Sequence, residues 1–590
     1  MTHTATHHPK RLIEVDLPIK RISEHARREK SIRHGHISTL HIWWARRPLA
    51  ACRAVVCASL WPDPADPLCP PEFREAAASA MRRFDEVSRD PLGQDPRDLD
   101  DPDELQRALL DFIAEFANWD RSTDQAYLDA ARTLTQSAHE ALGGLSGTRP
   151  LVVDPFAGGG AIPLEALRVG ADAFASDLNP VAVLLNKVVL EYIPRYGQAL
   201  ADEVRRWGGW IKEEAERELA EFYPTDPDGA TPIAYLWART ITCEGPGCGA
   251  EVPLIRSLWL AKKQNRSVAL RMVPRMDERK VEFEILEGVR AREVGEGTVR
   301  RGSATCPVCG YTTPVASVRR QLKARRGGAA DARLFAVVTT RPGERGRFYR
   351  LPTRQDLAAA KKAAEELERR KAEHVGPLSL VPDEPTPMGG GSGAGRAFSQ
   401  RNYGMDLFED LFTPRQALAL TTLARLVREA GEKVAEEQEN GLAAAVQTCL
   451  SLAIDRSADK LSSLARWDTS RENPQGTFSR QALQIVWDFD EVNPLSGSGG
   501  DWNTALTWIS LVSESVSSFF LDFQGHAESK SANKNDLPDE FAQILFTDLP
   551  YYDSVLYADL SATSYDLLLN RTRPTAFPSS ARWYKVLDVA

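Results

Sequence analysis

The spacing of apolar and polar residues predicts a helical start followed by a β-α-β-α passage. Apolar positions recur at helical spacing from Leu49 to Leu60, and residues 104–143 have the three-to-four spacing of two amphipathic helices. Residues 151–190 then read as a buried strand, a helix, a second strand and a second helix. Because strands that alternate with helices form parallel sheets, we expect an α/β fold with a parallel sheet here.

The rest of the chain has a mixed pattern. Residues 198–222 read as a helix, and residues 234–315 read as short strands around two pairs of cysteines. A charged helix is predicted at residues 354–374 and a flexible glycine-rich linker at 382–400. Two long amphipathic helices are predicted at 414–436 and 441–466, an apolar stretch at 502–523, and a buried strand at 541–548.

Length and composition indicate a multidomain globular protein without a membrane segment. The 590 residues correspond to about three to five domains. The hydrophobic fraction of 43% and the charged fraction of 26% are typical of soluble proteins. No apolar run approaches the roughly 20 residues that span a membrane, and the first residues lack the apolar centre of a signal peptide. We therefore expect a cytoplasmic location.

Charge is distributed unevenly behind the formal net charge of -9. Residues 83–104 are rich in acids, whereas residues 318–350 hold a block of basic residues against only Asp331 and Glu344. The block is suited to binding phosphates, and it is equally consistent with a solvated basic linker. Its members are Arg319, Arg320, Lys323, Arg325, Arg326, Arg333, Arg341, Arg345, Arg347 and Arg350.

A glycine turn separates the first strand of the β-α-β-α passage from its helix. The sequence DPFAGGG places Gly158, Gly159 and Gly160 just after the strand. Glycine lets a ligand approach the backbone, and the helix beyond it presents free N–H groups. Asp177 ends the next strand about 20 residues later, where a carboxylate can bind the ribose of a nucleoside cofactor. The alternative is a turn with a structural role only.

The phrase DPFAGGGAIPLEA, followed by SDLNPVA, resembles the S-adenosylmethionine loop of amino-group DNA methyltransferases. The resemblance implies that Asp177 contacts the ribose of S-adenosylmethionine. It also implies contacts to the cofactor, mainly at its methionine end, from Asp154, Phe156, Ala157, Gly158 and Gly160.

The stretch FTDLPYYDSV ends the last predicted strand with an acid. The same methyltransferase class carries an acid or Asn, two prolines and an aromatic residue there, and the implied catalytic residues in this chain are Asp548, Leu549, Pro550 and Tyr551. A carboxylate and a backbone carbonyl can accept the N–H groups of an exocyclic amine, while an aromatic ring stacks on the extruded base. Leu549 lacks the φ restraint of proline, so we expect a looser loop. The alternative is an ordinary strand end with a Pro-Tyr turn.

Two cysteine pairs have the spacing of a metal site. Cys243 and Cys248 lie five positions apart, and Cys306 and Cys309 form a C-x₂-C pair. Each pair can direct two thiolates from a tight turn to one tetrahedral metal, so we expect a zinc-ribbon-like insertion with structural Zn²⁺. The alternative is four unmetallated thiols. The single cysteines elsewhere are expected to be small buried hydrophobes.

An aromatic and basic block, HISTLHIWWARRPLAACRAVV, precedes the first predicted helix. Arg46 and Arg47 are suited to holding the carboxylate of a cofactor or the phosphates of DNA. The block is equally consistent with core aromatics and solvent-facing arginines. Its candidate residues are His36, His41, Trp43, Trp44, Arg46 and Arg47.

Several phrases in the same order resemble large bacterial methylases that begin with a domain of unknown function and are often associated with anti-phage defence. Among them are EVDLPIKRISEHARREKSIRHGHISTLHIWWARRPLAACRA, DPFAGGG, DLFTPRQALALTTL, AIDRSADKLSSLARWD and TDLPYYDSVLYADLS. The resemblance implies a Rossmann-like doubly wound methyltransferase sheet with zinc-ribbon and helical insertions, S-adenosylmethionine as cofactor, and methyl transfer to DNA at adenine N6. It further implies helicase or ATPase partner subunits of a defence system. The alternatives are an RNA base methyltransferase and a catalytically impaired DNA-binding subunit.

These observations divide the chain into eight expected segments. After YADLS the chain departs from the family, and residues 549–590 are too few for three further strands with their helices, so we expect a shortened gene product with an exposed sheet edge. The expected segments are the N-terminal block (1–62), an acidic helical segment (63–145), the cofactor-binding half (146–200), a helical connection (201–235), the zinc-ribbon-like insertion (236–330), the basic segment with helix and linker (331–400), a helical insertion (401–535) and the catalytic-loop strand with the C-terminus (536–590).

Overall fold

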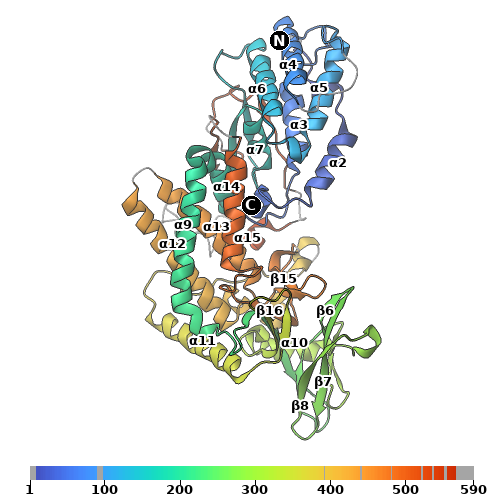
Figure 1. Cartoon of the computed structure of the whole chain (residues 1–590), viewed down its shortest axis with the longest axis vertical. Helices are drawn as coiled ribbons and strands as arrows, with labels where there is room; N and C mark the ends of the chain where they lie inside the picture. The colour runs from blue at the N-terminus through green and yellow to red at the C-terminus, as the bar shows by residue number, and fades with distance from the viewer. Residues whose placement is uncertain are drawn as a thin grey trace. The chain divides into compact units, whose positions relative to one another are not determined.

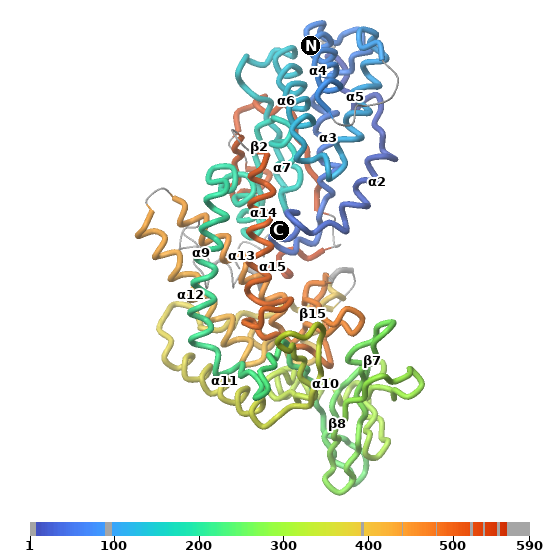
Figure 2. Tube along the Cα trace, in the orientation of Figure 1, coloured from blue at the N-terminus to red at the C-terminus, as the bar shows by residue number. Residues whose placement is uncertain are grey.

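The chain forms two compact units, shown in Figures 1 and 2. Unit 1 comprises Met1–Glu203 and Trp508–Pro550, and unit 2 comprises Val204–Thr507 and Tyr551–Ala590. No helix among the described residues is long and apolar enough to cross a membrane. The computed structural model describes residues 8–88, 97–390, 393–438, 441–479, 481–519, 523–534, 537–550 and 555–565.

The described part of unit 1 contains a four-stranded parallel sheet. Its spatial order is β17-β2-β1-β18, and every neighbouring pair is parallel. Numbered along the chain this order is 3-2-1-4, so the direction in which strands are added reverses between β1 and β18. This confirms the predicted α/β fold with a parallel sheet. The strands are β1 (Leu151–Asp154), β2 (Asp172–Asp177), β17 (His526–Ser529) and β18 (Ile544–Leu545), and α7 (Ala161–Arg168) and α8 (Pro180–Lys187) follow β1 and β2.

The N-terminal helices of unit 1 pack together beside this sheet, and Figure 1 shows them in blue to cyan. The predicted helix from Leu49 to Leu60 and the predicted pair within residues 104–143 are confirmed. The helices are α1 (Leu12–Val15), α2 (Ile19–Glu29), α3 (Leu49–Leu60), α4 (Pro71–Val87), α5 (Pro102–Phe116) and α6 (Gln125–Ala141).

A buried ion triad joins α3 to α7. Arg53 Nε donates to Glu165 Oε2 at 2.6 Å, and Arg168 Nε donates to the same oxygen at 2.8 Å. All three side chains are at most 2% exposed. Because an unpaired charge at such depth would cost several kcal/mol, the triad requires the two helices to stay together. The N-terminal helices therefore share one core with α7, the helix that follows β1.

Unit 2 combines antiparallel sheets with long helices. One sheet has the order β13-β12-β3-β16, and a second has the order β6-β7-β8. Apolar side chains from both sheets, including Leu236, Leu260 and Phe335, form a common core. The strands are β3 (Thr231–Ala238), β4 (Thr240–Thr242), β5 (Glu251–Pro253), β6 (Trp259–Lys263), β7 (Arg266–Arg275), β8 (Lys280–Glu287), β9 (Val299–Arg300), β10 (Ser303–Thr305), β11 (Thr312–Thr313), β12 (Arg333–Thr340), β13 (Phe348–Arg350), β14 (Arg466–Asp468), β15 (Asn473–Gln475) and β16 (Asp488–Val492).

The predicted helices at residues 198–222, 354–374, 414–436 and 441–466 correspond to α9, α11, α12 and α13, with ends that differ by a few residues. The helix α14 lies in the predicted apolar stretch, and α10 and α15 were not predicted. The glycine at position 197 interrupts α9, because its backbone (φ 52°, ψ -131°) is open to glycine but not to residues with a side chain. Within unit 2, α12 packs against α11 and α13. The helices are α9 (Ile193–Leu219), α10 (Val315–Lys323), α11 (Arg354–Glu373), α12 (Pro414–Glu437), α13 (Leu442–Lys460), α14 (Trp502–Ser517) and α15 (Tyr557–Tyr565).

Two predictions about local structure were wrong. The segment 382–400 is not a flexible linker in its described part, because Phe398 and Gln400 are buried and Gln400 Nε2 donates to the carbonyl of Pro387 at 2.8 Å. The strand predicted at residues 541–548 is not buried, because β18 is a two-residue edge strand and Leu545 is 70% exposed. The composition of a segment indicates how flexible and how apolar it is, but it does not indicate whether other segments of the chain pack against it.

Candidate functional site

The carboxyl ends of β1, β2 and β18 bring three predicted features to one edge of the unit 1 sheet. The glycine turn follows β1, Asp177 ends β2, and Asp548 lies three residues beyond β18. In open parallel sheets ligands bind at this edge, at the point where strand addition reverses. That point lies between β1 and β18, so the topology marks the same place that the motifs mark.

The glycine turn is held between a tryptophan and a carboxylate. Gly158 has a φ of 48°, and a Cβ atom added to it would lie 2.7 Å from Trp43 Nε1. The backbone N–H of Gly158 donates to Asp177 Oδ2 at 2.9 Å, and the N–H of Asn179 donates to Asp177 Oδ1 at 2.8 Å. Gly160, at φ 79°, caps the N-terminus of α7. A side chain at position 158 would therefore displace Trp43 or open the turn.

Asp154 connects the ends of β1 and β18. Its Oδ1 accepts hydrogen bonds from Thr547 Oγ1 at 2.8 Å and from the N–H of Phe156 at 3.1 Å. The side chain is buried, and this loss of hydration raises the pKa of Asp154 to about 6, with Asp177 acting in the same direction. Burial likewise raises the pKa of Asp177. Two acids with raised pKa values therefore flank the glycine turn.

The N-terminal block contributes a cation to this edge. Arg47 Nε forms an ion pair with Asp548 Oδ2, and both side chains are about one third exposed. Trp43 and Trp44 are buried, while Arg46 is exposed. The tryptophans thus belong to the core, as one reading expects, and Arg47 pairs with the predicted catalytic acid, which neither reading anticipated. The binding of a cofactor carboxylate or of DNA phosphates by Arg46 and Arg47 stays a prediction.

A buried glutamate fixes the helix that follows this block. Glu29 accepts the backbone N–H groups of Leu49 and Ala50, each at 2.8 Å, at the start of α3. His36 Nε2 lies 3.0 Å from Glu29 Oε1. These contacts satisfy the N–H groups that every helix start leaves open. They also fix the end of the loop that carries Arg47.

The other predicted site residues occupy less constrained positions. Phe156 is half-buried, and the N–H of the buried Ala157 donates to the carbonyl of Ser176 at 3.1 Å. Leu549 is 57% exposed and Pro550 is exposed. Tyr551 lies outside the described residues.

Sequence reasoning missed Thr547 and Asn186 near the glycine turn, and it named Trp43 as a candidate without connecting it to the turn. Trp43 packs against Gly158 and Gly159, Thr547 binds Asp154, and Asn186 Nδ2 donates to the carbonyl of Gly158 at 3.0 Å. Asn186 is 1% exposed and lies on α8. A polar residue within the apolar run VAVLLNKVVL was the available signal for Asn186, whereas no local pattern connects Trp43 to the turn.

The four paired cysteines form a cluster in unit 2. Their Sγ atoms all lie within 4.8 Å of one another, with 3.5 Å between Cys243 and Cys309 and 3.9 Å between Cys248 and Cys306. A tetrahedral zinc with Zn–S bonds of about 2.3 Å places its sulfurs about 3.8 Å apart. A Cβ atom at Gly245 would lie 3.1 Å from Cys309 Sγ, so glycine is needed there. The cluster is consistent with a structural zinc site.

The basic block of residues 318–350 is folded and largely neutralised. It contributes α10, β12 and β13 rather than a solvated linker. Arg325 pairs with Asp331 at 2.9 Å, and Arg350 pairs with both Asp226 and Asp356 at 2.6–2.7 Å. These arginines already have acidic partners, so the block as a whole is not a free phosphate-binding surface.

Comparison with known proteins identifies the N-terminal segment alone. Neither the curated proteins nor the solved structures give a match to the chain. Residues 16–86 are similar to the family DUF1156, a protein of unknown function. The matched segment contains α2, α3, Trp43 and Arg47, and it confirms the expected N-terminal domain of unknown function.

Proposed function

We propose that unit 1 transfers a methyl group from S-adenosylmethionine to an exocyclic base amine of DNA, with adenine N6 as the acceptor. The observation that carries the proposal is the hydrogen bond between Thr547 and Asp154. It joins the segment that carries Asp548 to the end of β1, which the glycine turn follows, although 393 positions separate the bonded residues. The proposed cofactor pocket and the proposed acceptor acid would then share one sheet edge.

The cofactor half of the proposed site is formed by Asp177 and the start of α7. An ionised carboxylate has about four lone-pair positions, so Asp177 can hold the turn and still accept ribose hydroxyls. S-adenosylmethionine supplies an electrophilic methyl group on a sulfonium. A sulfonium cation next to Asp154 would stabilise the ionised form of this acid, whose pKa burial raises to about 6.

The acceptor half is formed by Asp548 and the carbonyl of Leu549. Both can accept N–H bonds from a base amine and so localise its lone pair for attack. Arg47 forms an ion pair with the Asp548 carboxylate in this structure. Binding of a base amine to Asp548 therefore requires that Arg47 move away or that the carboxylate bind both groups. A DNA phosphate or the cofactor carboxylate is a suitable new partner for Arg47.

The architecture supports the finer fold proposal. The 3-2-1-4 order matches the first four positions of the doubly wound order 3-2-1-4-5-6, and we propose a Rossmann-like methyltransferase core with unit 2 as its insertion. We further propose that the cysteine cluster is a zinc ribbon. Helicase or ATPase partners in a defence system remain part of this proposal through the resemblance of the motifs.

A second candidate function is binding of cofactor and DNA without transfer. The ion pair between Arg47 and Asp548 favours it, because a carboxylate held by a guanidinium is a weaker acceptor for an amine. The exposed Leu549, at the position of a proline, acts in the same direction.

Calorimetric titration with S-adenosylmethionine, together with transfer of a tritiated methyl group to duplex DNA or RNA, tests the proposal. We expect binding, transfer to DNA, and about 100-fold slower transfer by Asp548→Ala. Asp539→Ala is the matched control, since Asp539 is an exposed acid of the same segment outside the site. Binding without transfer would favour the second candidate, transfer to RNA alone would replace DNA as substrate, and absence of binding would reject both cofactor-dependent functions.

A further inference from the structure

Unit 2 contains a cavity of about 410 Å³ that the proposed reaction does not use. Its volume lies within the range of small-molecule sites in proteins. The walls come from the start of β6, from β14 and β15, and from β16 with the residues before it. All of these segments belong to unit 2, so the cavity is complete within one compact body.

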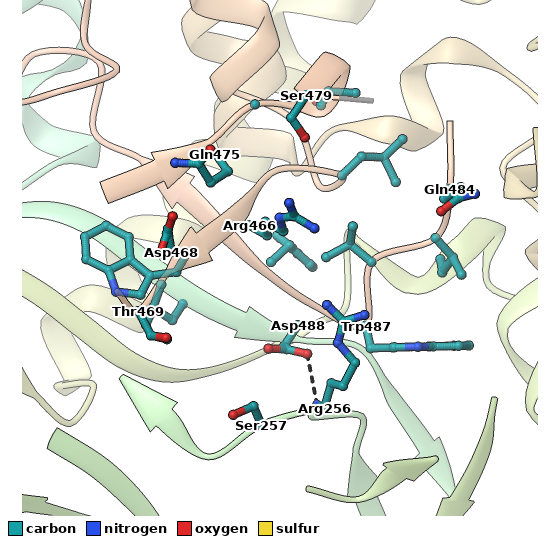
Figure 3. Close-up of a pocket in the computed structure, with 18 of the residues that line it drawn as sticks. Arg256, Ser257, Arg466, Asp468, Thr469, Gln475, Ser479, Gln484, Trp487 and Asp488 are labelled. Atoms are coloured by element: carbon teal, nitrogen blue, oxygen red, sulfur yellow. Dashed lines mark hydrogen bonds between the residues drawn. The ribbon is translucent and has the colours of Figure 1, made fainter. Parts of the chain in front are cut away.

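The cavity wall combines aromatic rings with charged groups of both signs. Trp259, Trp467 and Trp487 all line it. The charged residues of the wall are Arg256, Arg466, Asp468 and Asp488, and Gln475 and Gln484 add amides. Figure 3 shows Arg466 near the middle of these side chains and places Arg256 and Asp488 beside Trp487. Such a wall suits a flat ligand that carries both hydrogen-bond donors and acceptors.

The wall is fixed in place before any ligand arrives. Trp467 Nε1 donates to the carbonyl of Leu260 at 3.0 Å and contacts Tyr349 Oη at 3.3 Å. The backbone N–H of Lys262 donates to the carbonyl of Thr469 at 2.8 Å, which joins β6 to the turn after β14. A preformed wall loses little conformational entropy when a ligand binds.

Several polar groups of the wall retain capacity for a ligand. In the described part of the chain the half-buried Arg466 guanidinium has no hydrogen bond or ion pair. Asp488 Oδ1 accepts the backbone N–H of Arg256 at 3.0 Å, and within the same described residues its other oxygen has no partner. A half-buried arginine without a partner is uncommon, because its five N–H donors lose water contacts.

A lysine next to the wall adds positive charge. Lys262 follows the wall residue Trp259 along β6, and its Nζ lies 5.2 Å from the centre of the Trp259 ring. The neighbouring Lys263 already has an acidic partner, because its Nζ lies 2.5 Å from Glu472 Oε2. Stacking aromatic rings next to cations is how proteins hold single nucleotides of a strand. Arginine donates hydrogen bonds to acceptor atoms on the edges of bases, and carboxylates accept hydrogen bonds from the amino groups of bases.

From these contacts we propose that the cavity binds a nucleobase of a DNA strand, distinct from the base that is methylated. The choice of DNA as the source of the base rests on the proposed function. The tryptophans stack on the base, Arg466 and the carboxylates bind its edges, and Lys262 binds an adjoining phosphate. Unit 2 then supplies target recognition for the reaction in unit 1.

Fluorescence anisotropy with labelled single-stranded and duplex DNA, measured without cofactor, tests this site. We expect Arg466→Ala and Trp259→Ala to weaken binding about tenfold each, and Trp259→Phe to restore most of it, because phenylalanine retains stacking. Arg428→Ala is the matched control, since Arg428 is a half-buried arginine of unit 2 that does not line the cavity. Within the described residues the Arg466 guanidinium leaves no partner behind, so we expect its variant to keep the melting temperature of the wild type.

Competition separates base binding from binding of the backbone alone. Mononucleotides are expected to displace the DNA at concentrations at which inorganic phosphate does not. Equal displacement by phosphate, or equal weakening by Arg466→Ala and Arg428→Ala, would overturn the proposal. Failure here with intact methyl transfer would leave the proposed function standing, whereas cavity-dependent DNA binding without any transfer would support this site and count against the reaction.

Discussion

Asp154→Asn gives the most direct test of the electrostatics at the unit 1 sheet edge. Burial raises the pKa of Asp154 from 3.8 to about 6 in the folded chain. A carboxyl group with a raised pKa in the folded state prefers its neutral form there, so it contributes stability below pH 4 that is lost as the pH rises to about 6. Asparagine keeps the oxygen that accepts from Thr547 and Phe156 but cannot ionise.

The size of the effect follows from the two pKa values. Their difference corresponds to about 3 kcal/mol at 1.36 kcal/mol per pH unit, of which about 2 kcal/mol falls between pH 4.5 and 7.5. Asp154 is 2% exposed, so solvent screening does not reduce this value much. We therefore expect the stability of Asp154→Asn relative to wild type to increase by about 2 kcal/mol between these pH values. The cost of burying an amide cancels in this comparison, because it is the same at both.

Urea unfolding at the two pH values measures this difference, and limited proteolysis of the partly unfolded protein assigns the transition to unit 1. Asp539→Asn serves as control, because Asp539 is exposed and its substitution should leave the pH dependence unchanged. Parallel pH profiles for wild type and Asp154→Asn would refute the argument that burial sets the protonation of this acid.

Three further predictions concern the cysteine cluster, a buried acid and the proposed catalytic loop. Cys306→Ser should lose one zinc ion per chain by elemental analysis, and a chelator should then lower the melting temperature of the wild type but not of the variant. Burial raises the pKa of Asp490 to about 7, and neither of its oxygens has a hydrogen-bond partner in the described part of the chain. Its ionisation opposes folding as the pH rises from about 4 to 7, so Asp490→Asn should gain melting temperature relative to wild type between pH 4.5 and 8, and identical profiles would contradict this. Leu549→Pro should speed methyl transfer two- to fivefold by restricting the loop, and an unchanged rate would mean that the leucine is harmless.

Local sequence patterns determined much of the secondary structure, and they indicated the glycine turn and the cysteine cluster. The apolar spacing gave α3 its bounds, Leu49 to Leu60, because helix periodicity and the Pro48 before it are local signals. The glycine turn was predictable for the same reason, since only glycine tolerates the φ values at positions 158 and 160. The cysteine spacing likewise predicted one cluster, because each pair sits on a single tight turn.

Tertiary structure alone decided how these pieces combine. Three contacts join residues that lie more than one hundred positions apart along the chain. They are the pairing of β1 with β18, the ion pair of Arg47 with Asp548, and the packing of Trp43 against the glycine turn. The cavity of unit 2 is likewise assembled from strands that are distant along the chain. Local periodicity shows which face of an element is apolar but not which other element covers it. For that reason the sequence indicated the chemistry of the site, and only packing showed that its acid has an arginine partner.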